Sequence, residues 1–419
     1  KRYWLQATDS YARQQVRAVM EQQLLKAPQA LAASHFETAS VPPMHGERQE
    51  SMAREHVESV ALVEGGLVEL GVPAGLARVV AQDDQRIGLR IYLLDNSSST
   101  RQPDGSVVVA GTDGRLRQNP CTRWEEICAF AEDHARWNLR VGTPCEFVLL
   151  NSTSRTSGSR MVEGGDCVHI DRDQGPEANQ LQKLRELLMN NGPSPGTPIV
   201  ERLQDIQHRI QANFSALAQA RQMIFLTIVT DGLPTSRGSG QSGWVKDTKR
   251  TIETMRSLCA SLPVQLVIRL CTDEEQTIDF YNNIDEELEL PLDILDDISG
   301  EAREVAKHGN DWFAYTPVLH RIREAGTLSK ILDSIDERPL SVLEAQQLAE
   351  LLCGSQKPLA GLGKRQFVNE LQEIVAQAPL VYDARWQEMR PIVDIPKLRI
   401  AMRVGFRGVV LPVICPCLL

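Results

Sequence analysis

Long apolar runs alternate with amphipathic stretches through the middle of the chain. Residues 87–94 (IGLRIYLL), 145–150 (CEFVLL), 223–229 (MIFLTIV) and 264–270 (VQLVIRL) are apolar almost throughout, which is typical of strands buried on both faces. Between these runs, apolar residues recur every three or four positions, as they do in helices that pack on a sheet. The pattern therefore predicts an α/β fold, a doubly wound and mainly parallel sheet with helices on both faces.

This α/β domain is predicted to span residues 86–335. Short strands are expected at 160–170, which contains a glycine turn, and at 311–315. The helices predicted between the strands are residues 122–137, 180–189, 199–220, 244–260 and 273–287.

The flanking regions carry helical patterns. Residues 1–85 are predicted to be a helical N-terminal extension, with an amphipathic helix at 4–26 and short helices, broken at glycines, within 51–84. Residues 336–419 are predicted to be a mainly helical C-terminal region. Its expected elements are helices at 342–352 and 364–376 and one or two strands at 391–407.

The composition excludes several classes of protein. In 419 residues, 42% are hydrophobic and 24% are charged, as in ordinary globular proteins. Lys and Arg number 45 against 55 Asp and Glu, a net charge of −10, which argues against nucleic acid or an anionic membrane as the main partner. No apolar run reaches the ~20 residues of a membrane helix, so no membrane span is expected.

The cysteines and histidines form no recognisable pattern. Nine cysteines without a CxxC pair are too sparse for a disulfide scaffold, and eight histidines without HExxH spacing give little support for a zinc site. We therefore expect a cytoplasmic protein. The chain begins with Lys1 rather than Met and opens without a signal-peptide pattern, which leaves open whether a targeting segment precedes it.

Candidate chemistry lies in three polar loops at the ends of predicted elements. Asp95, Ser97 and Ser99 alternate in the loop after the first strand, so an extended loop would point all three side chains the same way. Thr197 precedes a predicted helix, and Asp231 follows the strand at 223–229. Ligand sites of open parallel sheets form beyond the carboxyl ends of the strands, so these loops are expected to meet there.

These residues resemble the von Willebrand factor A (vWA) domain, a Rossmann-like fold, and in particular its metal-ion-dependent adhesion site (MIDAS). The family motif combines Asp-x-Ser-x-Ser, a threonine in a Gly-Thr-Pro-like loop and an aspartate in a Thr-Asp-Gly loop. All five positions are matched in order, by Asp95, Ser97, Ser99, Thr197 and Asp231. Thr100 departs from the family, which often has an apolar residue after the second serine, and should affect packing under the loop more than metal binding.

The resemblance implies a bound divalent cation that contacts a partner protein. Mg²⁺ prefers six hard oxygen ligands, and Mn²⁺ or Ca²⁺ would also suit oxygen donors. By resemblance, the serines and the threonine ligate directly, and one or both aspartates act through water. Such an ion keeps its electrophilic character and favours an incoming carboxylate from an Asp or Glu of the partner. The predicted function is a metal-dependent protein-binding module, for adhesion or scaffolding, and not an enzyme.

Two alternatives remain open at this point. A Mg²⁺-dependent phosphoryl-transfer enzyme could use Asp95 at the strand end, but it would need a second aspartate at position 97, which is Ser, and a lysine near the loops, where the sequence has none. The chain also lacks a P-loop motif and a GxSxG motif. The second alternative is a metal-independent structural component of a complex, in which the loop residues are ordinary turn and helix-cap residues.

Overall fold

The computed structural model describes residues 60–111, 115–151, 164–237, 244–288, 291–355 and 357–404. The chain divides into two compact units. Among the described residues, the first unit contains those up to Val72, Ala77–Asp297 and Arg321–Leu328, and the second contains Pro73–Leu76, Ile298–His320 and those from Ser329 onward. None of the helices within the described ranges is long and apolar enough to cross a membrane. The helix predicted at 4–26 lies outside the described residues.

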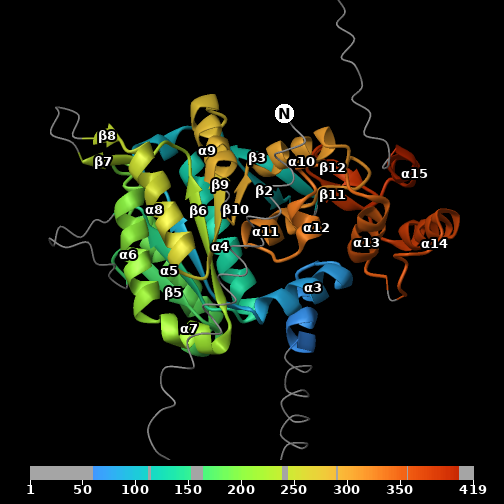
Figure 1. The fold of residues 1–419 in the computed structure, drawn as a ribbon, viewed down its shortest axis with the longest axis horizontal. Coiled ribbons are helices and arrows are strands. Elements are labelled where there is room, and N and C mark those ends of the chain that lie inside the picture. The colour runs from blue at the N-terminus through green and yellow to red at the C-terminus, as the bar shows by residue number, and fades with distance from the viewer. Residues whose placement is uncertain are drawn as a thin grey trace, which may run out of the picture. The chain divides into compact units, whose positions relative to one another are not determined.

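A six-stranded sheet forms the centre of the first unit (Figure 1). Its strand order is β10-β9-β6-β1-β4-β5, and every neighbouring pair is parallel except the antiparallel pair β4–β5. The four strands predicted from apolar runs are the adjacent strands β9, β6, β1 and β4, which confirms the mainly parallel sheet. The strands are β1 (Ile87–Leu94), β4 (Cys145–Leu149), β5 (Cys167–Ile170), β6 (Met223–Thr230), β9 (Val264–Leu270) and β10 (Leu292–Leu295).

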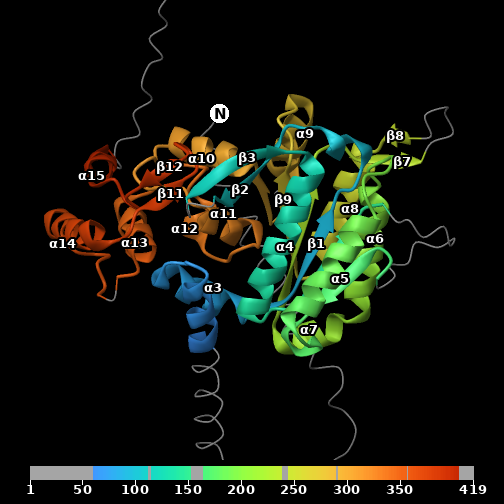
Figure 2. The same ribbon diagram turned by 180° about the vertical axis from the view of Figure 1, so that it is seen from behind.

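Alternate residues of each strand pack against helices on opposite faces. In β1, Ile91 and Leu93 belong to a buried cluster with the helices α6 and α8, whereas Tyr92 and Leu94 belong to a second cluster with α4 and α5 (Figures 1 and 2). Both faces are therefore covered, which explains why the strands are apolar throughout. These helices are α4 (Arg123–Val141), α5 (Glu177–Asn190), α6 (Ile199–Ala212) and α8 (Thr248–Ser261).

The ends of α4 illustrate how local sequence sets the helix boundaries. Thr122 caps the first turn in a reciprocal capping box with Glu125, and Gly142 ends the helix in a left-handed conformation at φ 83°. The remaining helices and strands up to β10 are α3 (Ala74–Asp84), η1 (Ser98–Arg101), β2 (Gly105–Ala110), β3 (Leu116–Cys121), η2 (Arg172–Gln174), α7 (Phe214–Ala220), β7 (Thr235–Arg237), β8 (Trp244–Lys246) and α9 (Glu275–Leu288).

Most of the second unit is helical. The buried side chain of Asn310 donates to the carbonyls of Ile335 and Arg338 and accepts from the backbone of Leu340, and it thereby fixes the turn before α13. The elements after β10 are α10 (Ile298–Lys307), α11 (Pro317–Glu324), α12 (Lys330–Asp333), α13 (Val342–Cys353), α14 (Lys364–Gln377), β11 (Val381–Asp383), β12 (Glu388–Arg390) and α15 (Ile395–Val404).

Two predicted helices of the first unit need correction. The helix expected at 244–260 begins only at Thr248, because residues 244–246 pair with β7 as an antiparallel hairpin. The helix expected at 199–220 is two helices, α6 and α7, separated at Asn213, whose φ of −110° and ψ of 8° are not helical.

Predictions in the flanks also differ from the structure. The segment 391–407, predicted as strand, contains the helix α15, with buried Ile395, Leu398 and Met402 at three- and four-residue spacing. β-branched residues suggested a strand, but this spacing fits a helix, whose first turn tolerates Pro396. Within the predicted α/β domain, the strand expected at 311–315 is a single bridge from Phe313 to Val393.

Buried ion pairs and hydrogen bonds run along the sheet-facing side of α4. Glu324 accepts a hydrogen bond from Arg269 Nε at 3.2 Å, and its second oxygen lies 3.2 Å from His134 Nε2. Arg269 also pairs with Glu126 of α4 at 2.5 Å. His134 and Asn138, one turn apart on α4, both contact the Tyr92 hydroxyl group. All of these residues are buried, and the Glu324 side chain is 9% exposed.

Candidate metal centre

The candidate site lies where the strand order reverses direction. From β1 the chain proceeds through α4 to β4 on one side, whereas β6, on the other side of β1, leads through α8 to β9. Since α4 and α8 cover opposite faces, the chain leaves β1 and β6 toward opposite faces of the sheet, and ligand sites of open α/β sheets form at such a point. Asp95 directly follows β1 and Asp231 directly follows β6, so both residues lie at this point of reversal.

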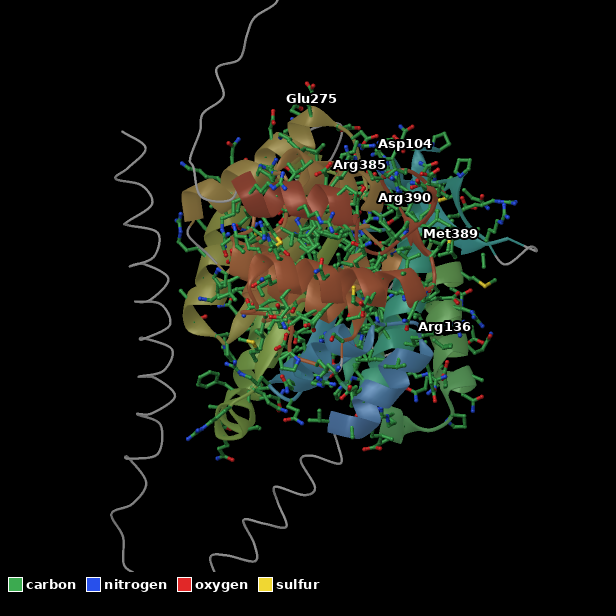
Figure 3. All side chains as sticks on the ribbon, turned by 90° about the vertical axis from the view of Figure 1, so that its right-hand side faces the viewer. Asp104, Arg136, Glu275, Arg385, Met389 and Arg390 are labelled. Carbon is green, nitrogen blue, oxygen red and sulfur yellow. The ribbon has the colours of Figure 1, made fainter. Side chains whose placement is uncertain are left out.

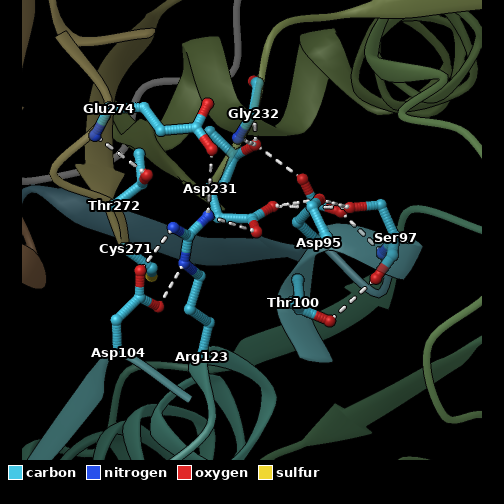
Figure 4. Close-up of polar contacts among 12 residues, drawn as sticks. Asp95, Ser97, Thr100, Asp104, Arg123, Asp231, Gly232, Cys271, Thr272 and Glu274 are labelled. Carbon is cyan, nitrogen blue, oxygen red and sulfur yellow. Dashed lines mark hydrogen bonds and ion pairs between the residues drawn. The ribbon is translucent and has the colours of Figure 1, made fainter. Parts of the chain in front are cut away.

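Four of the five predicted residues form one hydrogen-bonded cluster (Figure 4). The hydroxyls of Ser97 and Ser99 lie 2.8 Å apart, and both donate to Asp231 Oδ1, at 3.4 and 2.8 Å. Asp95 Oδ1 accepts from the Ser97 backbone at 2.7 Å, and its Oδ2 accepts from the Thr230 hydroxyl at 2.6 Å. Both aspartates are 1% exposed.

Thr197, the fifth predicted residue, is bonded through its backbone to Thr235, in the segment after β6, and not to this cluster. Its N–H donates to Thr235 Oγ1 at 2.8 Å, and its carbonyl accepts from the Thr235 backbone at 2.9 Å. Within the described chain, none of the hydrogen bonds connects the Thr197 hydroxyl to the other four residues. Gly196, at φ 92°, supplies the left-handed turn before it.

Asn96 and Thr100 hold the loop after β1 in place. The fully buried Asn96 side chain exchanges hydrogen bonds with the backbone of Asn151 and donates to the backbone carbonyl of Asn191. The backbone carbonyl of Asn96 accepts a hydrogen bond from the Ser194 N–H. Asn96 therefore connects the loop after β1 with the one that leads to Thr197. Thr100, also fully buried, donates to the Ser97 carbonyl at 2.8 Å, so its hydroxyl is used inside the loop.

Burial makes negative charge costly at the two aspartates. It raises the pKa of Asp95 to about 7, and the neighbouring charge of Asp231 contributes to the same rise. Burial also raises the pKa of Asp231, against the lowering effect of hydrogen bonds from Ser99 and Arg123. A divalent cation beside the two carboxylates would offset this cost.

Sequence reasoning missed Arg123, the first residue of α4. Its Nη1 lies 3.0 Å from Asp231 Oδ2, and its Nε and Nη2 each lie 2.7 Å from an oxygen of Asp104 (Figure 4). The side chain is only 3% exposed. The available signal was an arginine at a helix N-terminus, where the helix dipole disfavours a cation and the charge needs another partner.

The residues fit a small, hard cation. Ser97 Oγ, Ser99 Oγ and Asp231 Oδ1 lie within 3.4 Å of one another, all are oxygens, and both carboxylates are buried. No three His, Cys, Asp or Glu side chains gather as a metal cluster anywhere in the part of the chain that the structure describes. A cation here would therefore depend on hydroxyl oxygens as well as carboxylates.

A comparison of the sequence with protein-family models and with curated proteins finds no match. The resemblance to vWA domains thus rests on the five motif residues alone.

Proposed function

We propose that this protein is a vWA-like, metal-dependent protein-binding module that recruits an acidic side chain of a partner through a divalent cation, with Mg²⁺ as the first candidate. The observation that carries the proposal is the convergence of the Ser97 and Ser99 hydroxyls on Asp231 Oδ1, at the point where the strand order reverses. Asp95, on the adjacent strand end, supplies the second carboxylate.

Each residue of the site has a distinct role in this proposal. Ser97 and Ser99 present neutral oxygens, which turn from Asp231 toward the cation, and Thr197 adds a third hydroxyl from the neighbouring loop. Asp95 and Asp231 balance the charge. The bound cation would supply an electrophilic position for a carboxylate oxygen of the partner. Asn96 connects the loop after β1 to the loop that leads to Thr197 and would thereby help to bring the third hydroxyl toward the cation.

We expect one saturable metal site that depends on these side chains. Calorimetric titration of metal-free protein with Mg²⁺ or Mn²⁺ should give one-to-one binding, and Ser99→Ala should weaken it by more than about tenfold, because a direct oxygen ligand is removed. Ser106→Ala, in the nearby strand β2, is a matched control that should bind as the wild type does. Equal affinity in wild type and Ser99→Ala would contradict the site.

The bound cation should then capture carboxylates. Protein-bound Mn²⁺ enhances the relaxation rate of water protons. This enhancement should fall when a short peptide that contains Asp or Glu is added, because the peptide carboxylate displaces a water molecule from the ion. The same peptide with Asn or Gln in place of the acid should have no effect. If both peptides act alike, or if neither does, recruitment through a metal-bound carboxylate is wrong.

The same preparation also tests the enzyme alternative. Position 97 carries a serine hydroxyl where a phosphoryl-transfer enzyme of this kind would place its second carboxylate, and that hydroxyl bonds to Ser99 and Asp231. We therefore expect the metal-loaded protein to leave p-nitrophenyl phosphate intact. Hydrolysis that Asp95→Asn abolishes would favour the enzyme instead.

A further inference from the structure

Arg123 brings a permanent positive charge into the candidate metal site. Its guanidinium bridges two carboxylates, a bidentate pair with Asp104 and a single contact with Asp231 Oδ2, with Glu274 farther away at 3.9 Å. Arg123 and Asp231 are buried, whereas the Asp104 side chain is 50% exposed. The guanidinium is thus held from the solvent side and directed at the buried aspartate.

The two oxygens of Asp231 have different partners. Oδ2 receives the guanidinium, and Oδ1 receives the two serine hydroxyls that we assign to the metal. A cation that takes Oδ1 would therefore share one carboxylate with a guanidinium that is covalently tethered to the chain. In a site with little water, like charges on opposite sides of one carboxylate repel each other strongly.

We propose that Arg123 is an internal counter-ion for Asp231, which stabilises the metal-free site and thereby weakens its affinity for divalent cations. The inference rests on the proposed function, since it concerns the same site. Because Arg123 already neutralises part of the charge on Asp231, a metal ion gains less when it binds. Asp104 moderates the effect, because it offsets the charge of the guanidinium from the solvent side.

A purely orienting role for Arg123 predicts the opposite result. If the guanidinium only kept Asp231 Oδ1 directed at the serines, its removal would loosen the carboxylate and weaken metal binding. The direction of the change in affinity therefore separates the two roles.

The test is a calorimetric titration of the wild type and four variants with Mn²⁺ at pH 8. Arg123→Gln should bind Mn²⁺ at least about tenfold more tightly than the wild type, because the competing charge is gone. Arg123→Lys keeps the charge and should stay close to the wild type. Asp104→Asn should bind at least about threefold more weakly, because Asp104 then no longer offsets the guanidinium charge that opposes the metal at Asp231. The control is Arg136→Gln on the same helix, a half-exposed arginine that Figure 3 shows well apart from Asp104, and it should change nothing.

The outcomes distinguish this inference from the proposed function. Wild-type binding with unchanged or weaker binding in Arg123→Gln overturns the counter-ion role and leaves the metal site standing. Absence of Mn²⁺ binding in both proteins overturns both. If Arg123→Gln fails to fold, Asp104→Asn decides, because residue 104 is half exposed, and unchanged or tighter binding in that variant overturns the inference.

Discussion

Replacing Glu324 with alanine is expected to lower the free energy of unfolding by about 3–5 kcal/mol. The Glu324 carboxylate contacts Arg269 and His134, both buried, and its loss would remove one carboxylate partner of the Arg269 guanidinium, which also pairs with Glu126. Removal of one member of a buried charged network is costly because the remaining charge is desolvated and incompletely compensated. Urea denaturation monitored by tryptophan fluorescence would measure the change.

Two further variants test the cause of this effect. Glu324→Gln keeps the shape and part of the hydrogen bonding, so it should be less destabilising than the alanine variant. Glu253→Ala, an exposed glutamate on α8, should alter stability by less than ~0.5 kcal/mol. A loss in Glu324→Ala no larger than that in Glu253→Ala would show that the buried network contributes little.

Replacing Asp95 with asparagine should abolish metal binding and stabilise the metal-free protein at pH 8. Because burial and Asp231 raise the pKa of Asp95 to about 7, the folded protein binds this proton more tightly than the unfolded chain does. The free energy of unfolding of the metal-free wild type should therefore fall as the pH rises from about 4 to about 7. Asparagine does not titrate, so the variant should be more stable than the wild type at pH 8, by on the order of 2–4 kcal/mol.

Added metal should remove most of this difference in stability between the two proteins. At a hundredfold excess over its dissociation constant, Mg²⁺ would stabilise the wild type by ~2.7 kcal/mol and leave the asparagine variant unchanged. Thermal unfolding of the wild type and the Asp95→Asn variant at pH 5 and pH 8, with Mg²⁺ and with chelator, would measure both the pH dependence and the effect of the metal. The role of Asp95 would be refuted if the metal-free variant were less stable than the metal-free wild type at pH 8. It would also be refuted if Mg²⁺ stabilised the variant as much as the wild type.

The central sheet was predictable because burial on both faces leaves a strong signal. The strands β1, β4, β6 and β9 have apolar residues at most positions, on both faces, and such runs stand out in the sequence. The hairpin β2–β3 leaves no such signal, since its second strand reads LRQNPC and is largely exposed. The helix α15 was mistaken for strand because its composition is β-like, although its buried positions follow a helical spacing.

The candidate site was predictable to the extent that chain position determines it. Asp95 and Asp231 end parallel strands, so the rule for open sheets places them at one edge, and the structure has them there. Arg123 could not be found in this way, because its contact with Asp231 depends on how α4 packs against the sheet. The same holds for the loop of Thr197, whose position depends on hydrogen bonds from Asn96 and Asn151.

The parallel pairing of β1 with β6 also has a kinetic consequence. Ser97 and Asp231 are 134 residues apart in the sequence, and their oxygens meet only after the two strands have paired. Contacts of such long range form late, so a cation at this place has no complete binding site in the early stages of folding. Mg²⁺ should therefore leave the refolding rate almost unchanged and act by slowing unfolding.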